Sequence, residues 1–541
     1  MDIKFTLPQD FLSSILVHEG LTHQELTTAT TFGEKEIHDL KKNIGFDNNK
    51  YLRMQSENIK DRINQFDNKL YLEFGGKLFD DYHASRVLPG FEPDSKLKLL
   101  KQLSNHAEIV ITISAHDVER NKIRQDLGIT YDTDVLRLVD SFEINGLYVG
   151  SVVITQYNGQ EAANLFRNKL QKFGIKVYTH YNIAGYPSNI PLIVSEEGYG
   201  KNDYIETCRP LVIVTAPGPA SGKMATCLSQ LYHEHKRGVM AGYAKFETFP
   251  IWNLPLKHPV NLAYEAATAD LNDVNMIDPF HLEAYGITTV NYNRDIEIFP
   301  ILNLIFEKIY GHSPYKSPTD MGVNMAGYSI INDAICVEAA RQEIIRRYYA
   351  ALEALLKGSV NEKVAETLEL LMNQAGVTTA HRKVVQAALD RAEDSGTPAA
   401  AIELPNGEMI TSKTSKLLGA SAALILNATK RLAGIPHKAK IISPEAIEPI
   451  QKLKTQYLKS KNPRLHIDEV LIALSTSAAT NPEAAAAMEQ LSKLDGCQAH
   501  TSVMLSSVDI KSFKKLGIQL TCEAIYETRH VSYSSSSGEM Y

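Results

Sequence analysis

The stretch PLVIVTAPGPASGKMATCLSQLYHEHKRG, residues 210–238, decides the fold that we expect for this chain. The run at 210–216 is apolar on both faces, which is typical of a strand buried in the centre of a parallel sheet. A turn rich in glycine and proline follows it, and the segment 223–238 is predicted to form a helix. A strand, a tight turn and a helix in this order indicate an α/β fold.

The same alternation extends on both sides of this stretch. Strands are predicted at residues 69–79, 108–114, 147–157, 175–181, 274–278 and 287–292, and a helix is predicted at 159–174. Strands separated by helices are typical of a parallel sheet that helices cover. We therefore predict a large parallel-sheet α/β region that ends near residue 332.

The pattern changes after residue 332. Three helices are predicted within 333–396, and Asn361 and Thr379 are the expected caps of the last two. A smaller α/β unit is expected to follow, and its first two strands form a hairpin that turns at Asn406-Gly407. Its remaining predicted elements are a short strand before a helix capped by Ser443, strands at 468–477, 500–507 and 518–527, and a helix at 481–496.

These patterns divide the chain into five parts. A chain of 541 residues is too long for one ordinary core, so several domains are expected. The predicted parts are a helical extension (1–43), an N-terminal α/β domain (44–332), a helical subdomain (333–397), a C-terminal α/β subdomain (398–528) and a polar, disordered tail (529–541).

Composition narrows the functional class. A formal net charge of −7 argues against a protein that coats nucleic acid or acidic membranes, because such binding needs a basic surface. The 5 cysteines form no C-x-x-C pair, which argues against a disulfide framework and a cysteine zinc site. No signal peptide and no bilayer-spanning apolar run is recognisable, so we expect a cytoplasmic protein without membrane contact.

The turn after the central strand resembles a phosphate-binding loop. Gly218, Ser221, Gly222 and Lys223 could hold a phosphate, because a glycine-rich turn presents amides, the helix dipole favours anions and a lysine can reach a terminal phosphate. The spacing is one residue shorter than in the standard loop, and Met224 stands where a magnesium-binding hydroxyl is usual. A close-packed strand-to-helix turn with a solvated lysine is the structural alternative.

Two further stretches hold candidate site residues. Asp278 ends an apolar run, where it could bind a metal or act as a base, with His281 nearby; as the alternative, Asp278 caps a helix. Lys245 and Glu247 lie in a proline-rich stretch at 244–261 that suits a ligand wall or an ordered structural loop.

A zinc protease is excluded by spacing. The motif at residues 233–235 is His-Glu-His, whereas such enzymes need H-E-x-x-H to place both histidines on one helical face.

Residues 21–42 resemble the helix-turn-helix of phage-repressor-type DNA-binding domains. The matching positions are Thr22, Glu25, Leu26, Phe32 and Ile37. The would-be recognition helix carries acidic residues and no arginine, so few groups could contact phosphates. DNA binding is therefore not expected, and a packing extension is favoured.

Longer stretches, among them LYLEFGGKLFDDYHASRVLPGFEPDSK, GYPSNIPLIVS and YKSPTDMGVNMAG, closely resemble the uncharacterised protein family 0371, also called domain of unknown function 1846. The resemblance runs from about residue 44 to residue 527. It implies a bacterial cytosolic protein with a large α/β region, a helical subdomain and a smaller α/β subdomain. It supplies no catalytic residues.

From these observations we expect a cytosolic enzyme that binds a nucleotide or another phosphorylated small molecule, with ATP and Mg²⁺ as the candidate cofactors. Lys223 and its turn would hold the phosphate, and Asp278, His281, Lys245 and Glu247 would serve catalysis. A kinase-like, ligase-like or phosphosugar enzyme fits equally well. The alternative is a non-catalytic regulator that uses the N-terminal helices on DNA, and assembly into a homo-oligomer stays open.

Overall fold

The computed structural model describes residues 44–75, 81–124 and 127–527, so the expected N-terminal helices and C-terminal tail lie outside it. The chain forms two compact units that interleave along the sequence. The first unit runs to Thr248 and includes Asn303–Tyr315 and Asp320–Ala339. The second contains Phe249–Leu302, Lys316–Thr319 and the chain from Ala340 onward.

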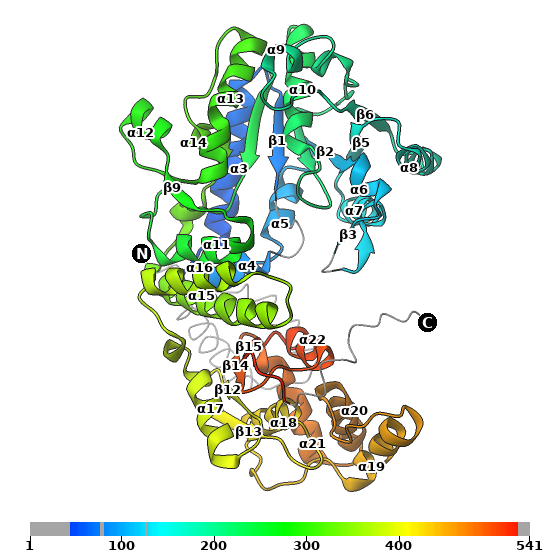
Figure 1. Cartoon of the computed structure of the whole chain (residues 1–541), viewed down its shortest axis with the longest axis vertical. Coiled ribbons are helices and arrows are strands. Elements are labelled where there is room, and N and C mark those ends of the chain that lie inside the picture. The colour runs from blue at the N-terminus through cyan, green and yellow to red at the C-terminus, as the bar shows by residue number, and fades with distance from the viewer. Residues whose placement is uncertain (1–43, 76–80, 125–126, 528–541) are drawn as a thin grey trace, which may run out of the picture. The chain divides into compact units, whose positions relative to one another are not determined.

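The first unit is built on a seven-stranded sheet, and every strand pair in it is parallel. In spatial order its strands are β11 (Gly322–Val323), β8 (Gly242–Phe246), β1 (Leu70–Phe74), β7 (Leu211–Thr215), β2 (Ala107–Ser114), β5 (Val149–Tyr157) and β6 (Val177–Tyr181). The fully buried β7 is the middle strand, so the predicted central strand of a parallel sheet is confirmed. Figure 1 shows this sheet with its helices.

The strand order reverses direction beside β7. After β7 the chain passes through α10 (Lys223–Lys236) to β8 on one side, and after β2 it passes through α7 (Tyr131–Ile144) to β5 on the other. Neighbouring strands whose connections leave in opposite directions form a switch point, where open α/β sheets bind ligands outside the carboxyl ends of their strands.

Helices cover both faces of this sheet. The Tyr71 hydroxyl donates to Glu234 of α10 across 2.8 Å, and the in-register Tyr243 packs on Phe306 of α13 (Asn293–Tyr310). Gly242 faces the other side, where a Cβ would lie 2.3 Å from the ring of Phe66, which ends α3 (Asn48–Gln65). Helices on both faces are what the apolar β1 and β7 need for burial.

The remaining elements of the first unit are short. They are α4 (Tyr82–Val87), α5 (Ser95–Gln102), α6 (Ala115–Glu119), α8 (Glu161–Lys172), α9 (Ile190–Ile193), the 3₁₀ turns η1 (Tyr199–Lys201) and η3 (Ala326–Ser329), and the antiparallel pair β3 (Ile123–Arg124) and β4 (Ile129–Thr130). Two more helices, α14 (Pro318–Met321) and α15 (Asp333–Leu356), contribute residues to both units, as α13 does.

The second unit contains two strands that the sequence assigned to the large sheet. β9 (Asn275–Ile277) and β10 (Val290–Tyr292) form an antiparallel pair of their own, so that assignment was wrong. Met276 and Ile277 are 43% and 42% exposed, which shows that an apolar run need not be a central strand. The neighbouring elements are α11 (Pro259–Ala267), η2 (Ala269–Leu271) and α12 (Pro279–Tyr285).

The C-terminal part of the second unit is a mixed four-stranded sheet. Its order is β13 (Met409–Lys413), β12 (Ala399–Glu403), β14 (Gln498–Thr501) and β15 (Gln519–Cys522), with β14 and β15 parallel and the other pairs antiparallel. The predicted hairpin is confirmed, and Gly407 adopts φ +82° in its turn. The helices are α16 (Glu362–Gln374), η4 (Thr379–His381), α17 (Lys383–Ser395), α18 (Ala420–Leu432), α19 (Pro444–Lys452), η5 (Leu453–Tyr457), α20 (Ile467–Ala478), α21 (Pro482–Glu489), η6 (Gln490–Leu494) and α22 (Ser507–Lys515).

Three local predictions here were wrong. Residues 468–477 form helix α20, because the buried positions Ile467, Val470 and Leu474 have helical spacing. Residues 440–442 pair with none of the strands in the described part of the chain, although Ile441 and Ile442 are buried in the core. Thr378, one residue before the expected cap, closes the capping box of η4.

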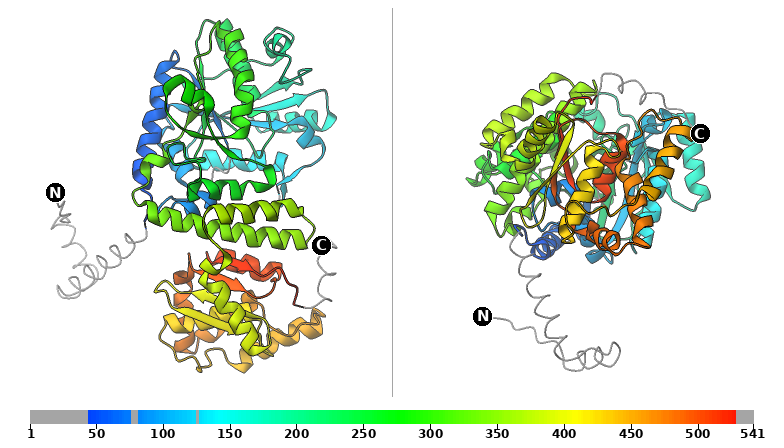
Figure 2. Two further views of the ribbon diagram at one scale, coloured as in Figure 1. Left: turned by 60° about the vertical axis from the view of Figure 1, so that its left-hand side comes forward. Right: turned by 90° about the horizontal axis from the view of Figure 1, so that it is seen from below.

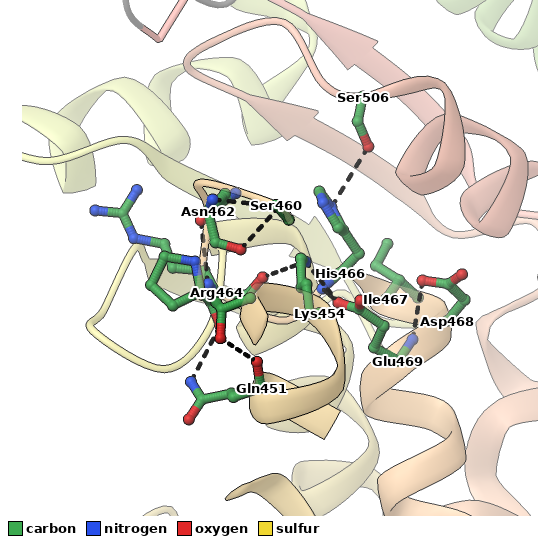
Figure 3. A network of polar contacts seen from close by, with 12 residues as sticks. Gln451, Lys454, Ser460, Asn462, Arg464, His466, Ile467, Asp468, Glu469 and Ser506 are labelled. Atoms are coloured by element: carbon green, nitrogen blue, oxygen red, sulfur yellow. Dashed lines mark hydrogen bonds and ion pairs between the residues drawn. The ribbon is translucent and has the colours of Figure 1, made fainter. Parts of the chain in front are cut away.

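Polar contacts hold the start of α20, as Figure 3 shows. The His466 amide donates to the Glu469 carboxylate across 2.8 Å, and Lys454 lies 2.8 Å from the same carboxylate. The imidazole of His466 lies 2.9 Å from Asp509 in α22, and this contact raises the pKa of His466. The ion pair therefore ties the beginnings of two helices together.

A single buried arginine joins α17 to the sheet. Arg382 is 1% exposed, and its guanidinium donates to the Thr521 hydroxyl across 3.0 Å and to the Ala499 carbonyl across 3.1 Å. It also contacts Gln498 and the carbonyl of Gln519. Both views of Figure 2 show the helices and the sheet of this C-terminal part.

Candidate functional site

The turn between β7 and α10 has a conformation that requires its glycines. Gly222 caps the helix with φ +80°, in the left-handed region that glycine favours. A Cβ on Gly218 would lie 2.3 Å from the hydroxyl of Tyr131, and one on Gly222 would lie 3.0 Å from Thr155. The Thr155 hydroxyl donates to the Ser221 carbonyl across 2.8 Å, so the turn is fixed to the carboxyl end of β5.

The helix start leaves hydrogen-bond donors open. Among the described residues, the backbone amides of residues 222–225 have no acceptor, and no side chain caps α10. Thr215, the last residue of β7, is 1% exposed. Its hydroxyl is buried and has no hydrogen-bond partner in the described part of the chain. Open amides at the start of a helix attract anions, since the helix dipole adds positive potential.

Cations lie close to this turn. Lys223 is the first residue of α10, and its charge lowers the pKa of Cys227, one helical turn further, against the larger rise caused by burial. On the other side, the Lys122 ammonium lies 4.8 Å from the ring centroid of Tyr131, whose hydroxyl adjoins Gly218. The Lys122 ammonium is also paired with the Asp117 carboxylate at 3.3 Å, so it is Lys223, at the helix start, whose charge favours an anionic ligand over a neutral one.

A buried carboxylate that the sequence analysis did not single out lies on the neighbouring strand. Glu73 is the penultimate residue of β1, is 9% exposed and accepts a 2.8 Å hydrogen bond from Tyr243. Its Cα pairs with Val214 of β7 on one side and Lys245 of β8 on the other. A charged residue inside the apolar run LYLEF was the available signal, because such residues are rarely buried without a role.

The predicted pair Lys245 and Glu247 lies at the end of β8. The ammonium of Lys245 lies 3.1 Å from the Glu247 carboxylate, and the two side chains are 17% and 5% exposed. The carboxyl ends of parallel strands meet at one sheet edge, so Lys245, Glu247, Glu73 and the turn after β7 share that edge. The structure thus brings six of the predicted site residues into one unit (Gly218, Ser221, Gly222, Lys223, Lys245 and Glu247).

Asp278 and His281 belong to the other unit. The Asp278 carboxylate accepts from the amides of Phe280 and His281 at 3.0 Å each, so it caps α12. Its second oxygen accepts 3.2 Å and 2.6 Å hydrogen bonds from the amide and hydroxyl of Thr319. The capping alternative therefore describes its contacts, and the metal or base role stays a prediction.

The described residues include no group of three or more His, Cys, Asp or Glu side chains arranged to hold a metal ion. Thr226, the next hydroxyl after Met224, is fully buried and lies 3.4 Å from the ring of His180. Ser221 is 1% exposed, and its hydroxyl donates to the Gly218 carbonyl across 2.9 Å. Within residues 44–75, 81–124 and 127–527, no helix has the length and apolar character to cross a bilayer.

A parallel sheet with an open helix start at its switch point defines the class of the protein: an open α/β protein with a candidate anion site. The chain belongs to the family of the domain of unknown function DUF1846. The N-terminal model of that family matches residues 44–376, and the C-terminal model matches residues 380–532. The resemblance seen in the sequence is confirmed.

Curated relatives cover nearly the same length. The chain is 58% identical over 486 residues to a UPF0371 protein of Streptococcus sanguinis (strain SK36), and the aligned region spans 90% of this chain and 98% of that protein. UPF0371 proteins of Streptococcus uberis (SUB1165) and Streptococcus pyogenes serotype M5 (SpyM50764) match with the same identity and coverage. The family matches begin at residue 44, and the helix-turn-helix resemblance, which lies outside the described residues, gains no support from them.

Proposed function

We propose that the protein is a cytoplasmic enzyme that binds a nucleotide or another phosphorylated small molecule at the turn between β7 and α10. The observation that carries the proposal is the set of open amides at residues 222–225, in the part of the chain that the structure describes, at the switch point of the sheet. The buried Thr215 hydroxyl, which lacks a partner among the described residues, gives a second reason to expect a ligand there.

The shortened loop restricts how a nucleotide would be held. Met224 cannot replace the magnesium-binding hydroxyl of the standard loop, because a thioether is a poor ligand for a hard cation. A magnesium ion would therefore come with the nucleotide rather than bind beforehand. ATP with Mg²⁺ stays a candidate ligand, as does a phosphorylated metabolite without metal. Self-association stays a further prediction.

A thermal-shift titration tests this proposal. Wild-type protein is titrated with inorganic phosphate, AMP and ATP, the last with and without Mg²⁺. A ligand at one hundred times its Kd stabilises the folded state by about 2.7 kcal/mol, which a melting curve resolves. Lys223→Ala is expected to abolish the shift, because it removes the ammonium beside the open amides.

The control is Lys172→Ala, an exposed lysine that ends α8 in the same unit. It removes the same charge from the protein and is expected to leave the shift unchanged. No shift of the wild-type protein with any of these compounds, or an equal loss in both variants, would count against the proposal.

A further inference from the structure

The Glu73 carboxylate is unusual for its place in the fold. A residue that is 9% exposed on a central strand normally carries an apolar side chain. Glu73 instead offers up to four acceptor positions, and among the described residues the Tyr243 hydroxyl is the one donor bonded to it. The second oxygen of Glu73 is not among the buried atoms that lack a partner in the described part of the chain, so it is open to solvent and can accept from a donor that arrives with a ligand.

The charge of Glu73 acts on the helix that follows the phosphate turn. The pKa of the Cys227 thiol is raised by burial and further by the Glu73 charge, while Lys223 opposes the rise. Cys227, which lies one helical turn into α10, therefore feels the charges of both groups, one on the strand and one at the helix start.

The spacing suits two different parts of one ligand. Adjacent strands are about 4.8 Å apart, and the open amides begin beside Thr155 of β5, three strands from Glu73 on β1, so roughly 14 Å separates the carboxylate from the helix start. A phosphate would be repelled by the carboxylate and attracted by the amides and Lys223. The group that reaches Glu73 must therefore be a neutral or cationic hydrogen-bond donor that is attached to the phosphate.

We propose that the site takes a phosphate ester that carries hydroxyl groups, such as a sugar phosphate or a nucleoside phosphate, and that Glu73 accepts a hydrogen bond from one of those hydroxyls. This inference rests on the proposed function and adds the chemical class of the ligand. Tyr243 is a positioning residue, because its hydrogen bond orients the carboxylate. At the end of the neighbouring strand β8, the ion-paired Lys245 and Glu247 add a hydrogen-bond donor and an acceptor to the same sheet edge.

Isothermal titration with matched probes tests the inference. Ethyl phosphate is an ester without hydroxyl groups, and glycerol 3-phosphate, ribose 5-phosphate, glucose 6-phosphate and AMP carry them. Wild-type protein is expected to bind at least one hydroxylated ester about tenfold or more tightly than ethyl phosphate, because hydrogen bonds to a charged acceptor are strong. In Glu73→Gln that preference should fall roughly 10-fold or more, while the Kd for ethyl phosphate changes less than about threefold.

The control is Glu108→Gln, which makes the same change in a buried carboxylate near the amino end of β2. It should leave the Kd values for ethyl phosphate and for the hydroxylated esters unchanged. If Glu73→Gln folds poorly, Glu73→Asp gives a second test. This variant keeps the charge but shortens the side chain, so it should retain part of the preference for hydroxylated esters.

The outcomes separate the two proposals. If the wild-type protein binds no phosphate compound, the proposed function fails and this inference fails with it. If it binds phosphates but shows no preference for hydroxylated esters, or if the preference survives in Glu73→Gln, the inference alone is overturned.

Discussion

The glycine that begins α10 offers a quantitative test of the turn. In Gly222→Ala the new Cβ would lie 3.0 Å from three atoms of Thr155, and the backbone would keep φ +80°. The left-handed conformation costs a non-glycine residue about 1–2 kcal/mol. Overpacking against a neighbour adds roughly 1–3 kcal/mol. We expect Gly222→Ala to lower the free energy of unfolding of the first unit by about 2–5 kcal/mol in total.

The other end of the same helix supplies the control. Gly238 has φ +79°, and a Cβ there would meet nothing within 4 Å. Gly238→Ala should therefore cost only the conformational part, about 1–2 kcal/mol. Urea unfolding followed by circular dichroism gives the stability of both variants, and titration with inorganic phosphate reports the turn. Equal stabilities for the two variants, or undiminished phosphate binding in Gly222→Ala, would refute the reasoning.

Two predictions concern the second unit. The pKa of His466 is raised above 6.5 by Asp509, so this ion pair stabilises the fold fully below pH 6.5 and the stabilisation is lost as the pH rises through the folded-state pKa. His466→Gln should flatten the fall in melting temperature between about pH 6 and pH 8, whereas His437→Gln, at an exposed position, should preserve it. Arg382→Met should destabilise this unit by about 3 kcal/mol, because several buried acceptors lose their donor. Lys383→Met, at the exposed neighbouring position, should change stability by less than about 0.5 kcal/mol in the same denaturation assay, and equal effects would contradict the buried-donor argument.

Local patterns predicted much of the first unit. The strand, turn and helix at 210–238 were predictable, because burial on both faces, glycine punctuation and helical spacing all act within a few residues. The order of the strands was not predictable, since β7 lies between β1 and β2 through contacts distant in sequence. The apolar runs at 274–278 and 287–292 were placed in the wrong sheet for the same reason.

The candidate site was predicted in part. The glycine spacing around Lys223 marked the turn, since the backbone there needs residues without a Cβ. Glu73 was missed because its meaning depends on the neighbouring strands, which bring Lys245 and the turn to the same edge. Residues 468–477 were wrongly predicted to form a strand because their aliphatic residues suit both structures. The capping box of His466 and Glu469, which indicates a helix, lies before the apolar run.

The interleaving of the two units has a consequence for how the chain folds as it leaves the ribosome. The sheet of the first unit lacks β11 until residue 323 has been made, by which point all of Phe249–Leu302 has already been synthesised. That segment must wait for the chain beyond Ala340 before its own unit can close. Since domains usually fold in order of synthesis, nascent chains halted between about residues 250 and 340 should be the most sensitive to proteolysis and the most dependent on chaperones.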